Sequence, residues 1–266
     1  MKKHTLHSIQ ALKEKNEPIA VLTAYDSSFS QLLSENGIDI LLIGDSLGMV
    51  MQGHQSTVPV LMKDMIYHTQ CVAKTNQSSW IITDFSYMSY ASEKQALNNA
   101  AKLMQAGANM VKLEGGEWLV STIKSLKDRG IPICAHLGLT PQSVDALGGF
   151  KVQARDKEGA AQLLIDSLAV EKAGADILVL ECVPKDVADK ITKRLKIPTI
   201  GIGAGNKTDG QVLVLQDMLG LNINFKPKFV KNFFESDNVH NVTEAIQAYV
   251  LEVKNRTFPN DEHSFK

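Results

Sequence analysis

The sequence has little cysteine and no long apolar run, and each shortage excludes a class of protein. Its three cysteines, Cys71, Cys134 and Cys182, are widely spaced and form no Cys-x-x-Cys pair, which favours reduced thiols in the cytoplasm. No apolar run approaches the roughly 18 residues that a membrane span needs. The opening Met1-Lys2-Lys3 is followed by polar residues where a signal peptide would have its apolar core. We therefore expect a soluble cytoplasmic protein with no membrane partner.

An excess of charge is also missing. The chain has 28 Lys and Arg against 29 Asp and Glu, which gives a formal net charge of -1. The two signs are mixed along the sequence, so no basic face for a phosphate backbone is implied. We expect small-molecule substrates and no nucleic-acid partner.

What the sequence does contain is a regular alternation of short apolar segments and amphipathic segments. The apolar segments show no strict alternation, as is typical of parallel strands that are covered on both faces. About eight such units favour closure into a (β/α)8 TIM-type barrel over an open sheet. The length of 266 residues, 44% of them hydrophobic, suits one barrel domain. We expect a single domain over residues 1–266, with a short polar tail from about residue 257.

The pattern places most of the elements of this barrel. Residues 5–14 are expected to form a lid helix before the first strand. The connection 47–62 is unusually long, and connections of that length inside a compact domain are usually functional. Seven strands are expected at residues 19–25, 39–44, 79–84, 109–114, 131–136, 176–181 and 198–202, with a weak eighth strand within 222–229. The other helices are expected at residues 26–37, 63–74, 92–105, 117–128, 156–172, 185–195 and 243–253.

Four of the predicted strands deliver an acid at or just after their C-terminal ends, namely Asp45, Asp84, Glu114 and Glu181. Strand C-termini converge on one face of a barrel, so these acids should surround one pocket. Several carboxylates in a low-dielectric cleft repel one another unless a cation is present. The ligands are oxygens, without zinc-type spacing of Cys or His, which favours Mg²⁺. Asp45 and Asp84 are the best direct ligands, and Glu114 could bind through a water.

Each of these acids also has a plainer interpretation. A strand-end acid can simply cap the next helix. Glu181 ends the most apolar strand, so its ionised form should be partly desolvated and suited to act as a general base. The alternative for Glu181 is an ion pair with a neighbouring lysine.

Three other residues near the strand ends could contact a substrate. Lys112 lies two residues before Glu114 and shares its face of the strand, so it could bind a substrate oxyanion or merely neutralise Glu114. His136 could donate to a substrate oxygen, although a structural role is as common. Ser46 could offer its hydroxyl and backbone N–H to an anion, or could cap a turn.

Two further features carry little functional signal. The glycine run 201–205 follows the seventh strand and lacks the acidic partner of a dinucleotide-binding loop, so it is weak evidence for NAD. Cys182 should face away from Glu181, as an inert core thiol.

Several longer motifs follow one another along the chain. They are Ile43-Gly44-Asp45-Ser46-Leu47-Gly48-Met49, Gln52-Gly53-His54, Val111-Lys112-Leu113-Glu114-Gly115-Gly116, His136-Leu137-Gly138-Leu139-Thr140-Pro141-Gln142, Leu180-Glu181-Cys182-Val183-Pro184, Gly201-Ile202-Gly203-Ala204-Gly205 and Glu262-His263-Ser264-Phe265. Taken together, these motifs resemble the ketopantoate hydroxymethyltransferase family, in the same order from about Thr5 to Phe265. One departure is Ser86, where the family commonly has proline.

The resemblance implies a barrel of the phosphoenolpyruvate/pyruvate type and a reaction of pantothenate biosynthesis. In that reaction, 5,10-methylenetetrahydrofolate, 3-methyl-2-oxobutanoate and water give 2-dehydropantoate and tetrahydrofolate. The resemblance also implies one Mg²⁺ per subunit and a large homo-oligomer, typically a decamer.

Roles for individual residues follow from the same resemblance. Asp45 and Asp84 match the metal ligands, Glu114 matches the more distant acid of the metal site, and Glu181 matches the proton acceptor. The positions that match substrate-binding residues are Asp45, Ser46, Asp84, Lys112 and His136.

The implied chemistry agrees with the pattern of strand-end acids. A 2-oxo acid chelated to Mg²⁺ becomes acidic at the adjacent carbon, because the metal stabilises the enolate oxygen. Glu181 would remove that proton, and the enolate carbon would attack the one-carbon unit of the folate. The rival functions are a Mg²⁺-dependent lyase or mutase on the same barrel and a non-catalytic barrel that binds small acids.

Overall fold

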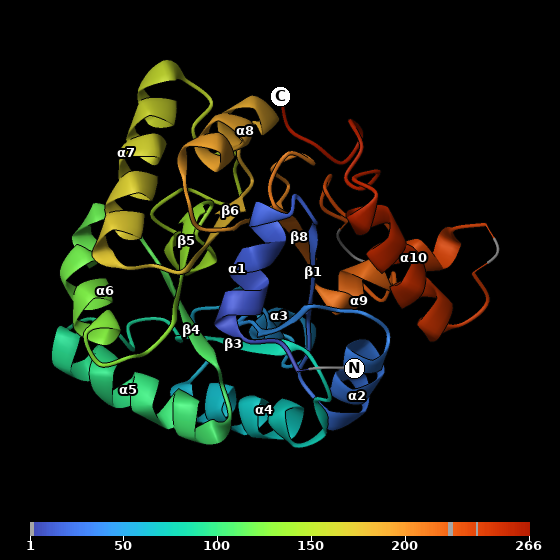
Figure 1. The fold of residues 1–266 in the computed structure, drawn as a ribbon, viewed down its shortest axis with the longest axis horizontal. Helices are drawn as coiled ribbons and strands as arrows, with labels where there is room; N and C mark the ends of the chain where they lie inside the picture. The colour runs from blue at the N-terminus through green and yellow to red at the C-terminus, as the bar shows by residue number, and fades with distance from the viewer. Residues whose placement is uncertain (1–2, 223–225, 238) are drawn as a thin grey trace.

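The computed structural model describes residues 3–222, 226–237 and 239–266. Its eight strands are parallel and close into a barrel in sequence order, with β8 pairing back onto β1 (Figure 1). The predicted (β/α)8 barrel is therefore confirmed. The strands are β1 (Ile19–Thr23), β2 (Ile40–Ile43), β3 (Trp80–Asp84), β4 (Met110–Glu114), β5 (Ile133–Gly138), β6 (Ile177–Glu181), β7 (Thr199–Ile202) and β8 (Gly210–Leu213).

The helices begin and end at residues that the local sequence favours. Asp26 and Ser92 accept hydrogen bonds from the backbone N–H three residues ahead, as N-caps do. Gly107 and Gly174 end their helices in the left-handed region, both with φ of 114°. No helix in the described residues combines the length and apolarity that a membrane crossing requires. The helices are α1 (Leu6–Glu14), α2 (Ser27–Glu35), α3 (Leu47–Val50), α4 (Met62–Thr75), α5 (Glu93–Ala106), α6 (Val120–Lys127), α7 (Lys157–Ala173), α8 (Lys185–Arg194), α9 (Leu215–Met218) and α10 (Val242–Lys254), with 3-10 turns η1 (Glu117–Leu119), η2 (Pro141–Ser143) and η3 (Phe233–Glu235).

The core has two layers, one inside the barrel and one between the strands and the outer helices. Ile19 and Val21 of β1 point inward, whereas Ala20 and Leu22 belong to the outer layer. Both faces of each strand are buried, which explains the apolar runs without alternation. Helix α1 contributes Ile9 to the inner layer. It crosses the N-terminal end of the barrel, where the predicted lid helix covers the packed interior (Figure 1).

The same kind of hydrogen bond occurs at the N-terminal end of each even-numbered strand. The residue just before each of these strands accepts, through its side chain, the backbone N–H at the start of the preceding strand. The bonds run from Ala20, Ile81, Ile133 and Thr199 to Asp39, Asn109, Asp176 and Asp209, at 2.8, 3.0, 3.0 and 2.9 Å. The three aspartates also bind Lys254, Lys127 and Lys13, at 2.8, 2.6 and 2.7 Å. Four equivalent bonds thus fix the register at this end of the barrel.

The structure corrects the predicted eighth strand, which was expected within residues 222–229. The strand is instead Gly210–Leu213, and residues 223–225 lie outside the described residues. The sequence pattern does not indicate a strand here, because glycine is uncommon in strands. The position nevertheless requires glycine, since a Cβ there would lie 2.5 Å from the carbonyl oxygen of Ile19. Burial by both neighbouring strands, rather than local propensity, makes this segment a strand.

The closing segment, expected as a polar tail, packs against the barrel. Phe258 is buried and its ring lies 5.4 Å from that of Phe233. The carbonyl of Phe265 accepts the backbone N–H of Lys185 at the start of α8. The polar side chains of this segment therefore flank two anchored aromatic rings.

We predict that Asp39→Asn destabilises the fold by about 1–2 kcal/mol at pH 7, because it removes a charged hydrogen-bond partner. Burial alone would raise the pKa of Asp39, but His4, Lys254 and the Ala20 N–H together lower it. A lowered folded-state pKa stabilises the protein above the unfolded value, about 3.9, and the stabilisation is lost as the pH falls through the folded value. The effect of Asp39→Asn should therefore shrink at pH 3.5, measured by urea unfolding.

Asp189→Asn is the matched control for Asp39→Asn. Asp189 forms an exposed ion pair with Lys193 on α8, so its loss should cost less than about 0.5 kcal/mol. A cost for Asp39→Asn that is equal at both pH values would contradict the role of the charge.

Candidate active site

The C-terminal ends of five adjacent strands bring the predicted side chains together. Each comes from the strand end that the sequence indicates, and all but Glu181 are almost fully buried. These side chains are Asp45 after β2, Asp84 on β3, Lys112 and Glu114 on β4, His136 on β5 and Glu181 on β6. None of the four acids occupies the N-cap position of the following helix. The capping alternative for these acids is therefore not what the fold uses.

The closest ion pair of the cluster joins Lys112 and Asp84. Lys112 Nζ lies 2.8 Å from Asp84 Oδ2 and 3.7 Å from Glu114 Oε1. The same Asp84 oxygen accepts the backbone N–H of Asp45 at 3.1 Å. The other oxygen, Asp84 Oδ1, is buried and has no hydrogen-bond partner among the described residues. Lys112 thus neutralises Asp84 more directly than it neutralises Glu114.

His136 connects two carboxylates. Its Nδ1 lies 3.1 Å from Glu114 Oε1, and its Nε2 lies 3.2 Å from Glu181 Oε2, too poorly aligned for a regular hydrogen bond. Burial and Lys112 lower the pKa of His136, but Glu114 and Glu181 outweigh them and raise it to about 9. His136 is therefore a cation at neutral pH. Glu181 pairs with this histidine rather than with a lysine, and its side chain is 15% exposed.

Ser46 is held by a tyrosine that the sequence does not single out. Tyr25 Oη lies 2.8 Å from Ser46 Oγ, and burial raises the pKa of Tyr25 above its usual value. Ser46 precedes α3 without capping it through its side chain. Gly44 makes room for this arrangement, because a Cβ at that position would lie 2.7 Å from Ser46 Oγ.

Gln142 is a second residue at the site to which the sequence assigns no role. Its Nε2 donates to Asp45 Oδ2 and to the Phe85 carbonyl, both at 2.8 Å. Its backbone N–H donates to Glu114 Oε2 at 3.0 Å, and its Oε1 accepts from Tyr90 Oη at 2.7 Å. The only signal in the sequence is its place in a Thr-Pro-Gln turn after β5, which does not reveal contacts with other strands.

Cys182 follows Glu181 in the left-handed region, with φ of 48°. Burial, and then the charge of Glu181, raise the pKa of its thiol. A buried thiol with a raised pKa is unreactive, in keeping with the predicted inert thiol.

The charges of the cluster fit a bound divalent cation. Burial raises the pKa of Asp45 well above its usual value, and the nearby Glu114 and Asp84 raise it further. A cation beside Asp45 and Asp84 would offset this repulsion and give Asp84 Oδ1 a partner. Within the described ranges, no three His, Cys, Asp or Glu side chains form a ready metal-binding group. Mg²⁺ is commonly held by only one or two carboxylates plus waters and substrate oxygens, so two aspartates suit it.

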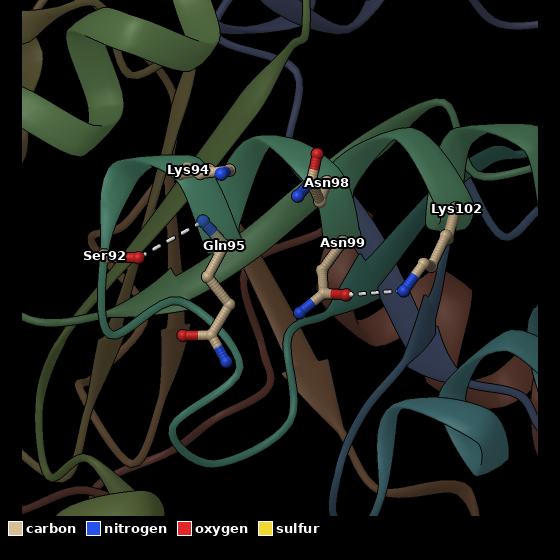
Figure 2. Close-up of a pocket in the computed structure, with 6 residues that line it drawn as sticks. All are labelled: Ser92, Lys94, Gln95, Asn98, Asn99 and Lys102. Carbon is tan, nitrogen blue, oxygen red and sulfur yellow. Dashed lines mark hydrogen bonds between the residues drawn. The ribbon is translucent and has the colours of Figure 1, made fainter.

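A depression on the outer surface of α5 is unrelated to this cluster. It is lined by residues of one helix and its N-cap, and Figure 2 shows two of its internal hydrogen bonds. Ser92 Oγ accepts the N–H of Gln95 at 3.3 Å, and Asn99 Oδ1 accepts from Lys102 at 3.3 Å. The lining residues are Ser92, Lys94, Gln95, Asn98, Asn99 and Lys102. No Asp, Glu or His is among these lining residues, so its serine and lysines have no general base beside them within the lining.

Comparison with known sequences finds close relatives over the whole chain. The family model described as ketopantoate hydroxymethyltransferase matches residues 3–261. A 3-methyl-2-oxobutanoate hydroxymethyltransferase of Marinomonas sp. (strain MWYL1) is 56% identical over 262 residues, covering 98% of this chain and 94% of the relative. One of Photorhabdus laumondii subsp. laumondii is 54% identical over 265 residues and covers 100% of both chains.

Solved structures with the same fold are more distant in sequence. A phosphonopyruvate hydrolase complex with oxalate and Mg²⁺ has a TM-score of 0.63 at 14% identity, covering 83% of this chain and 84% of that chain. A 2,3-dimethylmalate lyase, described as a member of the PEP mutase/isocitrate lyase superfamily, has a TM-score of 0.59 at 14% identity, covering 82% and 80%. These likenesses confirm the (β/α)8 barrel fold.

We predict that Asp45→Asn stabilises the metal-free protein at pH 7 by about 0.5–2 kcal/mol, the usual size of a stabilising substitution. The raised pKa of Asp45 means that its charged form disfavours folding above the unfolded value. The asparagine can still accept the hydrogen bond from Gln142 and carries no charge. Urea unfolding in the presence of a chelator measures the effect.

Asp39→Asn serves as the control. The pKa of the Asp39 carboxyl is lowered, so the same substitution there should decrease the free energy of unfolding instead of increasing it. A loss of stability in Asp45→Asn would show that the carboxylates of the site do not repel one another.

Proposed function

The chain belongs to the ketopantoate hydroxymethyltransferase family, and from this we propose that it acts on 3-methyl-2-oxobutanoate. Its relatives match it over nearly their whole length and are named hydroxymethyltransferases. The chain is therefore an enzyme that transfers a one-carbon group. In the proposed reaction, 5,10-methylenetetrahydrofolate, 3-methyl-2-oxobutanoate and water give tetrahydrofolate and 2-dehydropantoate, in pantothenate biosynthesis. The observation that carries the proposal is the buried Asp45, Asp84 and Lys112 cluster beside Glu181.

Asp45 and Asp84 are the proposed ligands of one Mg²⁺ per subunit. Both are buried, and one oxygen of Asp84 has no hydrogen-bond partner in the part of the chain that the structure describes. Glu114 is already bound by His136 and by the Gln142 N–H, which suits an acid that acts through a water. When bound, Mg²⁺ would draw electron density from the 2-oxo acid and make its C3 proton more acidic.

Ser46 and Lys112 are the proposed partners of the substrate's oxygen atoms. The Ser46 hydroxyl is fixed by Tyr25. Lys112 lies among the acids, with Nζ 2.8 Å from Asp84 Oδ2 and 3.7 Å from Glu114 Oε1. Nearby carboxylates outweigh burial and raise the pKa of Lys112. Lys112 therefore stays cationic and can attract the carboxylate or the developing oxyanion of an oxo acid.

Glu181 is the proposed general base. It is the most exposed carboxylate of the group, so a substrate at the mouth of the barrel can reach it. His136 lies beside it, with Nε2 3.2 Å from Glu181 Oε2, and helps to orient it. Glu181 takes the proton from C3, and the C3 carbon then forms a bond to the methylene carbon of the folate as one of the two methylene–nitrogen bonds breaks. Water supplies the hydroxyl oxygen of the product as the second methylene–nitrogen bond breaks. The two folate nitrogens gain the proton from C3 and one proton from water, which releases tetrahydrofolate.

We also propose that the protein is a cytoplasmic homodecamer, as the family resemblance implies. Large apolar side chains are exposed on its outer surface, including Trp118, Tyr67 and Leu251, which are 66%, 61% and 60% exposed. Contacts between subunits could bury such side chains. Sedimentation should give a particle of ten chains, and a stable monomer would contradict the proposal.

We predict that Glu181→Gln abolishes Mg²⁺-dependent exchange of the C3 proton. In D2O, the parent enzyme should exchange the C3 proton of 3-methyl-2-oxobutanoate for deuterium, followed by proton NMR. Removal of the base should slow this exchange by about 10²–10⁴-fold. The measurement needs no folate, so it isolates proton removal from carbon transfer.

Glu93→Gln, on the outer surface of α5, is the control for this experiment and should exchange as the parent does. Exchange that persists in Glu181→Gln would remove Glu181 as the base. Absence of exchange in the parent would favour a barrel that only binds acids, and folate-independent cleavage of a larger oxo acid would favour a lyase.

A further inference from the structure

We infer that Gln142 is a positioning residue that holds Asp45 and Glu114 in place and thereby sets the affinity for Mg²⁺. The inference rests on the metal site of the proposed function. Gln142 is only 6% exposed, and it lies on η2, in the connection after β5. Its four hydrogen bonds reach Asp45 after β2, Phe85 and Tyr90 after β3, and Glu114 at the end of β4. Through its side chain and its backbone N–H, this one residue thus connects the ends of three strands.

Gln142 is the one hydrogen-bond partner of the Asp45 side chain in the described part of the chain, through Nε2 at 2.8 Å. It also supplies the backbone N–H that fixes Glu114 Oε2 at 3.0 Å. The other oxygen of Glu114 faces His136. Without Gln142, Asp45 would keep only repulsive carboxylate neighbours and the more distant charge of Lys112.

The orientation of the Gln142 amide is fixed by its partners. Nε2 has two hydrogens, and they face two acceptors, Asp45 Oδ2 and the Phe85 carbonyl. Oε1 faces the hydroxyl of Tyr90 at 2.7 Å. A reversed amide would bring Oε1 against both acceptors, so only one orientation avoids repulsion between oxygens. Tyr90 therefore supports the donor that holds Asp45.

Such a residue acts on the metal through the ligands. Partners of metal ligands fix the ligand oxygens in the geometry that the ion needs, and their loss typically costs about 10–100-fold in metal affinity. Gln142 is neutral, so it holds Asp45 without competing for the charge that binds the cation. Its effect should appear in metal binding even where folding is unchanged.

The test is a calorimetric titration of the metal-free, full-length protein with MgCl2. Gln142→Met keeps the side-chain length and removes both amide donors, so it should weaken Mg²⁺ binding about 10–100-fold. Tyr90→Phe keeps Gln142 but frees its Oε1, so it should weaken binding by a smaller factor. The control is Gln211→Met, because Gln211 is as deeply buried and donates from Nε2 to Gly205 and Thr208, away from the acids. Its Mg²⁺ affinity should stay within about twofold of the parent's.

Each outcome decides the inference. Mg²⁺ binding in folded Gln142→Met that equals the parent's would overturn it, and so would an equal loss in Gln211→Met. If Gln142→Met does not fold, Tyr90→Phe decides, and unchanged affinity there overturns the inference. A parent that binds no Mg²⁺ overturns the metal site and this inference together. A parent that binds Mg²⁺ but forms no 2-dehydropantoate would refute the proposed function and leave the Gln142 result to stand by itself.

Discussion

The repulsion between buried carboxylates at one end of the barrel is the constraint around which the site is built. Asp45, Asp84 and Glu114 repel one another, and Lys112 supplies a positive charge beside Asp84 and Glu114. Charges removed from water cost several kcal/mol each unless they are paired. One lysine, one protonated histidine and the backbone N–H of Gln142 offset only part of this cost. The remaining negative charge supports the proposal that the site binds a cation.

At the opposite end of the barrel, each of three acids is paired with a positive charge. There, Asp39, Asp176 and Asp209 each accept a backbone N–H and each face one lysine. Those acids stabilise the fold because their charges are matched, whereas the acids at the C-terminal end are left partly unmatched. This division follows the general behaviour of the fold, in which the N-terminal face provides stability and the C-terminal face provides chemistry.

The sequence predicts the parts of this structure that depend on local pattern. Strand-end acids such as Asp84 and Glu181 can be read directly, because a strand that ends in a carboxylate projects it to the barrel rim. The repeated Ala-Gly-Ala-Asn109 and Ala-Gly-Ala-Asp176 segments predict the helix caps, and they contain two of the four register-fixing side chains. The family resemblance supplies the roles that pattern alone leaves open, and those roles remain predictions. Strand β8 is missed because Gly210 is required by its close approach to Ile19 of β1, and the local sequence does not reveal that contact.

Tyr25 and Gln142 are missed for a related physical reason. Their partners are 21 and 97 residues away in the chain, so their importance comes from closure of the barrel and not from their neighbours in sequence. The choice of an amide at position 142 also has a cause that only the site reveals. A lysine there could also donate to Asp45, but its charge would offset the negative charge that the proposed site offers to a divalent cation. A neutral donor would orient Asp45 and leave that negative charge available, which is a physical reason for an amide at residue 142.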